Sequence, residues 1–222
     1  IYLFYTMYLL TFTGLLGITI TGDAFNLFVF LEISSLSSYV LISLGAERNA
    51  LTAALRYLIL GTVGATFYII GVGLMYQMTG TLNMSDLAAR LPEVAETKTI
   101  LVAIGFITVG VGLKLGLFPV HVWLPNAYAY APSVVTAFLA ATATKVAVYV
   151  LIRIYFTVFG TKIFAALPID EFLLILGLIA ILSMSAVAIY QTNAKRLLAY
   201  SSVAQIGYMI IGISMVTATG LT

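Results

Sequence analysis

Seven stretches of apolar residues, separated by short polar breaks, run along nearly the whole chain. A helix needs about 20 mostly apolar residues to cross the hydrocarbon core of a bilayer. The pattern therefore predicts an all-α, polytopic transmembrane helix bundle with about seven spans. We expect these spans over residues 2–20, 27–44, 51–76, 100–117, 133–158, 172–190 and 197–216.

The fourth span is interrupted rather than ended by an ordinary loop. It stops at Pro119, and the following segment HVWLPNAYAYAP contains Pro125 and Pro132 but stays apolar and aromatic. Proline breaks a regular helix, and irregular backbone at membrane depth is tolerated only where it is buried in protein or lines a cavity. The sequence thus predicts one broken helix, with the break at Pro119.

The longest polar stretch, residues 77–99, separates the third and fourth spans. Within it, SDLAARL is typical of a short surface helix, and we expect Ser85 to be its N-cap. Basic residues near the span ends divide evenly between the two sides of the membrane, so the positive-inside rule leaves the orientation open.

Composition narrows the possible functions. Only 8% of the residues are charged, against about 25% in soluble domains, while 62% are hydrophobic. The net charge of +2 does not indicate a basic surface that binds nucleic acid. With no cysteine and a single histidine, we expect no disulfide, no metal site and no resident cofactor. Because both ends lie in or beside apolar runs, we expect the chain to be part of a longer one.

Three ionisable residues fall well inside spans: Glu32, Lys114 and Lys145. Each charge facing lipid costs about 2.5–3.5 kcal/mol, so we expect all three to face the bundle interior. One acid cannot pair with two lysines, and a buried lysine changes its charge state readily, which suits proton transfer. The alternative is a structural ion pair or a snorkelling side chain. Arg153 shares a helix face with Lys145 but lies near the span end, where snorkelling to headgroups is expected.

Other polar residues admit two interpretations. His121 follows the break by two residues, and it either relays protons between water and a buried lysine or holds the segment in shape through hydrogen bonds. Ser34, Ser35, Ser37 and Ser38 either join a polar seam with Glu32 or pack helices closely. Gly110, Gly112 and Gly116 around Lys114 allow either water or a neighbouring helix to approach.

Four strings, in this order, resemble the antiporter-like proton channel family: TGDAFNLFVFLEISSLSSYVLISLG, LKLGLFPVHVWLPNAYAYAPS, ATKVAVYVLIR and NAKRLLAYSSVAQIGYM. This family comprises large membrane subunits of NADH:quinone oxidoreductase, of Mrp-type sodium/proton antiporters and of membrane-bound hydrogenases. GDAFNLFVFLEI and TGTLNMSDLA look most similar to the D-type protein of the Mrp antiporters.

The resemblance implies a fourteen-helix subunit with two inverted five-helix repeats. Residues 1–158 would form the first repeat, a half-channel, and residues 159–222 the first two helices of the second. Matched by motif, Glu32 pairs with Lys114, the central proton carrier, while His121 and Lys145 continue the path. Asn126 and Asn193 depart from the pattern, because many members have aspartate at these positions.

The resemblance also implies a function, a location and partners. We expect a proton-translocating subunit, most similar to that of a Mrp-type antiporter, or alternatively of an NADH:quinone oxidoreductase or a hydrogenase. Its partners would be other membrane subunits, protons and sodium, in a prokaryotic inner membrane. The chain has no motif for redox or hydrolytic chemistry of its own, although the parent complex can be an oxidoreductase. A purely structural scaffold is the remaining alternative.

Overall fold

A computed structural model describes residues 2–165 and 169–215. Within these ranges all regular structure is helical apart from a single two-residue bridge. Seven helical segments are long and apolar enough to cross a membrane, which confirms the expected all-α bundle. They are Tyr2–Ile20, Ala24–Ser43, Asn49–Thr79, Lys98–Leu115, Ser133–Phe159, Ile169–Ile189 and Ala194–Ser214.

The first three helices lie against one another in sequence order. They are α1 (Tyr2–Ile20), α2 (Ala24–Ser43) and α3 (Asn49–Thr79). The fourth membrane helix, α5 (Lys98–Leu115), packs along α3. Close contact is possible because Gly64 of α3 and Gly110 of α5 face each other, and a methyl group on Gly110 would lie 2.7 Å from the Gly64 carbonyl oxygen.

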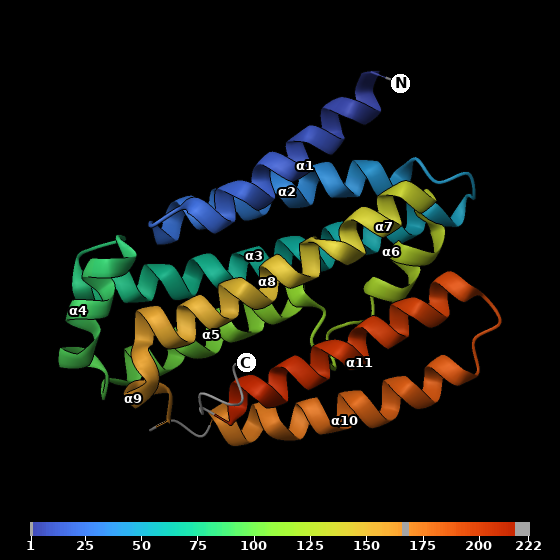
Figure 1. The fold of residues 1–222 in the computed structure, drawn as a ribbon. Coiled ribbons are helices and arrows are strands. Elements are labelled where there is room, and N and C mark those ends of the chain that lie inside the picture. The colour runs from blue at the N-terminus through green and yellow to red at the C-terminus, as the bar shows by residue number, and fades with distance from the viewer. Residues whose placement is uncertain (1, 166–168, 216–222) are drawn as a thin grey trace.

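A short helix, α4 (Met84–Val94), closes one end of the bundle (Figure 1). Its N-cap is Asn83, whose side chain accepts hydrogen bonds from the amides of Ser85 and Asp86. The expected cap, Ser85, is therefore wrong by two residues, because an amide oxygen at position 83 already satisfies the first free N–H groups of the helix. Asp86 and Arg90 form an exposed ion pair on α4 with a separation of 2.9 Å.

The expected break in the fourth span is present, and it begins earlier than Pro119. Helix α5 ends at Leu115, with Gly116 in the left-handed conformation as its C-cap (φ 78°). Glycine adopts this conformation without steric cost, so it ends the helix three residues before the proline. The chain then continues without regular helix until α6 (Leu124–Tyr130) begins.

The fifth span contains a discontinuity that the sequence does not reveal. It consists of α7 (Ser133–Ala141), α8 (Ala143–Ile152) and a π-helical turn, η1 (Arg153–Phe159). Thr142 separates the first two with φ −118° and ψ −55°, outside the usual α-helical range. Thr142 therefore interrupts the regular helix in the middle of the span, although the Val146 amide still donates to the Thr142 carbonyl at 2.9 Å.

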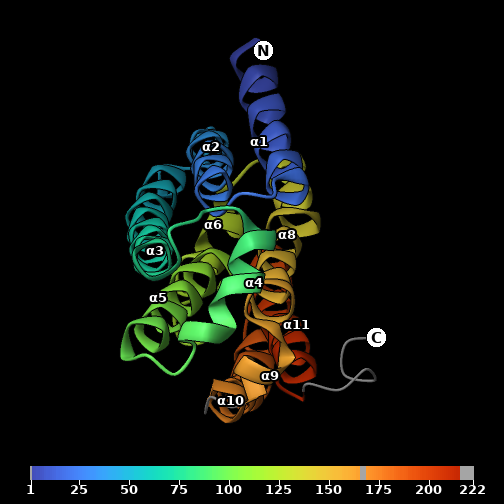
Figure 2. The ribbon, with the colours of Figure 1, turned by 90° about the vertical axis from the view of Figure 1, so that its left-hand side faces the viewer.

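The last two spans form a hairpin on one side of the molecule. After α9 (Gly160–Ala165), α10 (Ile169–Ile189) packs along α11 (Ala194–Ser214). Seen end-on in Figure 2, α1 to α3 and the α10–α11 pair lie on opposite sides, with α5 and α8 between them. The hairpin contacts the rest mainly through α6 and α9. The expected end of the seventh span, Val216, lies outside the described residues.

Candidate functional site

An ion pair between α2 and α5 forms the centre of the site. The ammonium of Lys114 lies 3.1 Å from Oε1 of Glu32 and donates a hydrogen bond of 2.5 Å to the hydroxyl of Ser35. Glu32 and Ser35 are one helical turn apart, so both face the same lysine. The two charged side chains are only 6% and 20% exposed, for Lys114 and Glu32 respectively. The structure thus brings together the acid and the lysine that the resemblance pairs.

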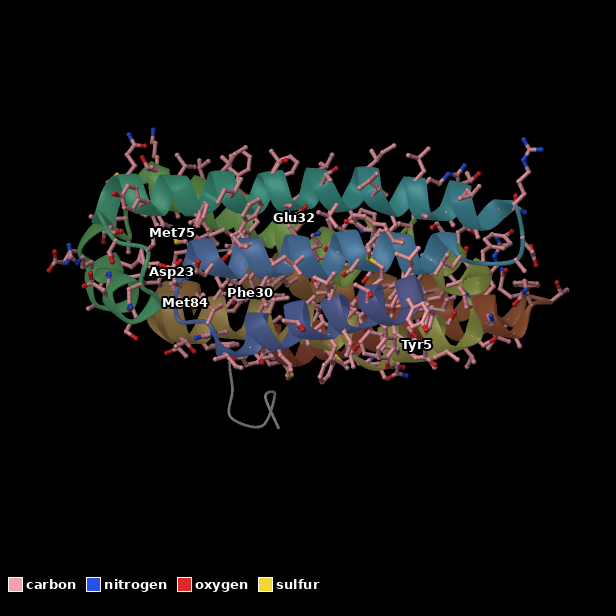
Figure 3. All side chains as sticks on the ribbon, turned by 90° about the horizontal axis from the view of Figure 1, so that it is seen from above. Tyr5, Asp23, Phe30, Glu32, Met75 and Met84 are labelled. Carbon is pink, nitrogen blue, oxygen red and sulfur yellow. The ribbon has the colours of Figure 1, made fainter. Side chains whose placement is uncertain are left out.

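The pair lies inside the bundle and away from its ends. Figure 3 shows Glu32 well along α2 from the end that carries Asp23, Met75 and Met84. Lys114 occupies the last turn of α5, where the free carbonyl groups of the helix favour a positive charge. The break after Leu115 therefore places an ammonium at a helix C-terminus in the interior of the protein.

Aromatic residues that sequence reasoning did not single out surround this break. The indole of Trp123 donates a hydrogen bond of 2.9 Å to the carbonyl of Leu113, at the C-terminal end of α5. The Trp123 ring stacks on Tyr57 with 3.9 Å between centroids, and Tyr57 meets Tyr39 edge-on. These contacts hold Trp123 against the end of α5 and against α3. The one available signal was Trp123, the single tryptophan of the chain.

His121 lies in the irregular segment but does not contact the ion pair. Its side chain is buried, its ring stacks on Phe118 with 5.5 Å between centroids, and its Nδ1 atom is buried without a hydrogen-bond partner. Among the residues that the structure describes, no hydrogen bond joins His121 to Lys114 or Glu32. Both interpretations of His121, the relay and the structural histidine, therefore stay predictions.

The described part of the chain does not bury Lys145, and its expected position in the interior of the longer subunit stays a prediction. Lys145 is exposed, and its ammonium donates a hydrogen bond of 2.6 Å to the carbonyl of Ala140, near the end of α7. Lys145 follows the interruption at Thr142 by three residues. Tyr149 and Arg153 share the Lys145 face, as their spacing predicts, with the Arg153 guanidinium 6.0 Å from the Tyr149 ring centre.

The serines divide between the two interpretations. Ser35 joins the polar site through Lys114. The hydroxyls of Ser34, Ser37 and Ser38 donate to backbone carbonyls of their own helix. Gly14 of α1 packs directly on Ser34, where a methyl group would lie 2.7 Å from the Ser34 nitrogen. Ser34 and Ser37 therefore serve close packing of α1 on α2, with Ser37 also accepting a hydrogen bond from Thr11. Ser34 and Ser38 also line a small cavity beside Lys114.

The described ranges contain no group of three or more acidic, histidine or cysteine side chains that could hold a metal ion. What the site offers is a buried acid–base pair in hydrogen-bond contact, beside a break in a membrane helix. Such an arrangement can exchange and hold protons.

These features define an integral membrane protein with an ionisable site between its helices. Residues 21–222 match the family described as NADH:quinone oxidoreductase/Mrp antiporter, TM, and the chain belongs to this family. The resemblance seen in the sequence is thereby confirmed.

Three similar proteins illustrate the range of the family. The N-type subunit of NADH-quinone oxidoreductase from Desulforudis audaxviator is 51% identical over 215 residues, which are 96% of this chain and 42% of that protein. The D-type protein of the Na(+)/H(+) antiporter from Alkalihalophilus pseudofirmus is 36% identical over 223 residues, 97% and 43% respectively. A chain of the archaeal membrane-bound sulfane sulfur reductase superposes with a TM-score of 0.87 at 33% identity, covering 94% of this chain and 42% of that one.

The chain therefore spans less than half of the length of these relatives. The identity to the quinone-oxidoreductase protein is higher than that to the antiporter protein. The similarity to the D-type Mrp protein expected from GDAFNLFVFLEI is present, but the comparisons do not single it out.

Proposed function

We propose that this chain carries a proton-translocating half-channel within a subunit of a multisubunit membrane complex. The observation that carries the proposal is the buried ion pair between Glu32 and Lys114 at the end of α5. Moving a proton onto Glu32 or away from Lys114 breaks this pair, so the charge state of each group controls that of the other. Ser35 holds the ammonium through its hydroxyl when the carboxylate is neutral.

The proposed path leaves Lys114 toward α8. A cavity of about 20 Å³ adjoins Lys114 and is lined by Ser34 and Ser38 of α2 and by Ala143 and Val146 of α8. One water molecule needs about 10–15 Å³ and polar partners, which the lysine and the serine hydroxyls supply. A water there shortens the step from Lys114 to Lys145, and Lys145 passes the proton on from the outer face of α8. His121, which lies in the irregular segment, is proposed to relay protons between water and Lys114.

The proposal is tested in the full-length subunit within its assembled complex. Replacing Lys114 by Ala or Glu32 by Gln is expected to abolish proton transport, because either change leaves a single titratable group at the site. Transport is measured in inverted vesicles or proteoliposomes with a pH-sensitive dye, and the polypeptide content of the purified complex establishes assembly.

Asp86→Asn is the matched control, because it removes one partner of an exposed ion pair of similar separation. It is expected to leave transport unchanged. Normal transport by a fully assembled Lys114→Ala complex would contradict the proposal. Retention of transport when Glu32, Lys114 and Lys145 are all replaced by apolar residues would instead favour a structural scaffold, because buried ion pairs are often replaceable in this way.

We further propose that residues 1–158 form one five-helix repeat and that residues 159–222 begin a second. The limited contact of the α10–α11 hairpin with the rest of the described chain supports this division. The proposed partners are the neighbouring membrane subunits, and the proposed location is a prokaryotic inner membrane, as the organisms of the relatives suggest.

Two parent complexes remain candidates, each favoured by one observation. The 51% identity to an N-type protein favours a quinone oxidoreductase, and the similarity of two motifs to a D-type protein favours an Mrp-type antiporter that also moves sodium. Purification of the native complex separates them. Quinone-dependent proton uptake with redox proteins present indicates the first, and sodium-dependent proton release without redox proteins indicates the second.

A further inference from the structure

A polar cavity lies between α3, α6 and α11, at the end of the bundle opposite α4. Its volume is about 210 Å³, and it is lined by Asn49, Thr52, Ala53, Arg56, Asn126, Tyr130 and Arg196. It brings together two arginines from distant parts of the sequence, and no acidic residue lines it. The cavity is separate from the Glu32–Lys114 site, with which it shares no lining residue.

The two guanidinium groups differ in how they are held. Arg196 donates from Nη2 to Oδ1 of Asn126 and lies over the ring of Tyr130, with 5.7 Å between its central carbon and the ring centre. Both partners are neutral, so the positive charge is oriented but not compensated. Arg56 forms no hydrogen bond or ion pair with any residue in the described ranges, and it is exposed. The cavity therefore has two positive charges available to an external anion.

The length of α3 places this cavity at the depth of lipid headgroups. The helix has 31 residues, so it is about 46 Å long, whereas the hydrocarbon core of a bilayer is about 30 Å thick. Arg56 comes seven residues after Asn49, about 10 Å from the start of the helix. Its guanidinium therefore lies near the boundary between headgroups and hydrocarbon.

An apolar surface continues from Arg56 toward the membrane centre. Ile59 and Val63 follow it at i+3 and i+7, on the same face of α3, and they are 53% and 40% exposed. The face leads into a second hollow of about 220 Å³ along the same helix, lined by Thr62, Val63, Thr66, Phe67 and Ile70. An acyl chain fits this surface, whereas a free inorganic anion would leave it unused.

We propose that the cavity binds the phosphate of an anionic phospholipid, whose acyl chains lie along the exposed apolar face of α3. Arg56 and Arg196 contact the phosphate oxygens as charge-assisted hydrogen-bond donors, and Asn49 and Thr52 add polar contacts from the first turn of α3. Basic pockets between membrane helices bind such headgroups in other proteins. The lipid joins the α3 side of the molecule to the α10–α11 hairpin.

A substitution at Asn126 tests the proposal directly. Asn126→Asp keeps an oxygen in contact with Arg196 but adds a negative charge, which compensates the guanidinium from within the protein. It is expected to lower the affinity for the phosphate while preserving the contact between α6 and α11. If Arg196 has only a structural role, Asn126→Asp is expected to leave lipid binding unchanged, because an ion pair there would keep or strengthen the contact between α6 and α11.

The test is native mass spectrometry of the full-length protein, delipidated in detergent and titrated with phosphatidylglycerol or phosphatidylcholine. Wild type is expected to retain one phosphatidylglycerol. Arg56→Gln and Asn126→Asp are each expected to weaken this binding about fivefold. Arg48→Gln is the matched control, because Arg48 precedes the same helix, carries the same charge and does not line the cavity. It is expected to bind like wild type.

Three outcomes would overturn the proposal. Equal binding of phosphatidylglycerol and phosphatidylcholine would show that the headgroup charge is not recognised. Equal weakening by Arg48→Gln and Arg56→Gln would show that the whole surface attracts lipid rather than this cavity. Displacement of the bound phosphatidylglycerol by millimolar inorganic phosphate would identify a site for the free anion.

Discussion

At the scale of single residues, the cost of a charge facing lipid predicted the Glu32–Lys114 pair correctly, whereas the same argument did not predict the exposure of Lys145 in the described part of the chain. A carboxylate and an ammonium inside apolar helices must find partners, and Glu32 of α2 and Lys114 of α5 find each other at 3.1 Å. Lys145 follows a discontinuity at Thr142 that no proline or glycine marks. Its orientation therefore depends on how α7 and α8 pack, which one sequence does not specify.

The hydrogen bond from Lys145 to Ala140 allows its two possible roles to be separated. Lys145→Arg keeps donors for the carbonyl but remains charged at all accessible pH values, because the guanidinium does not deprotonate. If Lys145 passes protons on, this variant is expected to fold normally and lose most transport. Thermal unfolding of the purified protein and dye-monitored transport measure the two effects.

Lys145→Met is the complementary variant. It removes both the proton carrier and the hydrogen bond to Ala140, so it is expected to lose transport and about 1 kcal/mol of stability. Full transport by Lys145→Arg would show that the side chain only stabilises the end of α7.

At the scale of helices, the sequence predicted the existence of every span and misplaced several of their ends. Apolar length is sufficient to identify a membrane helix, since each one satisfies its own backbone hydrogen bonds. The ends of helices depend on capping residues, and the sequence offered two neighbouring caps at each of two ends. Gly116, and not Pro119, ends α5, and Asn83, and not Ser85, caps the short helix α4. The π-helical turn after Ile152 has no sequence signal that we recognise.

The contact between α3 and α5 supports a prediction about packing. In Gly110→Ala the new methyl group would lie 2.6 Å from the Tyr68 nitrogen, and backbone atoms cannot rotate away. The variant is expected to lower the free energy of unfolding by about 1–3 kcal/mol. Reversible unfolding in mixed detergent, followed by circular dichroism, measures the change.

Gly105→Ala is the control on the same helix, because nothing lies within 4 Å of its added methyl group. It is expected to be neutral or to stabilise α5 by about 0.5–1 kcal/mol through reduced backbone entropy in the unfolded state. Equal destabilisation by the two variants would mean that the close approach at Gly110 does not limit the packing.

At the scale of the whole molecule, the arrangement separates two kinds of charge. The Glu32–Lys114 pair lies in the interior and compensates itself, whereas Arg56 and Arg196 lie toward one end and meet only neutral groups. The sequence revealed the first set, because charges inside spans are conspicuous. It did not reveal the second, since Arg56 and Arg196 are 140 positions apart and only the fold brings them to one cavity.

At the end of the molecule near α4, hydrogen bonds between two turns affect the rate of local opening. Two reciprocal backbone hydrogen bonds tie the α1–α2 turn to the α3–α4 turn, from Ala24 to the Leu82 carbonyl at 2.9 Å and from Met84 to the Gly22 carbonyl at 2.8 Å. These amides belong to the first residues of α2 and α4, where N–H groups have no partner within their own helix and normally exchange fast with solvent deuterium.

We expect both amides to exchange as slowly as those inside α2 and α3, because neither can open unless the two turns separate. Hydrogen–deuterium exchange resolved to single residues measures this, with the Gly80 amide, which bonds only within its own helix end, as the internal comparison. Exchange of Ala24 and Met84 at the rate of Gly80 would show that the turns part freely. Slow exchange would make the ends of α2 and α3 open and close as one cooperative unit.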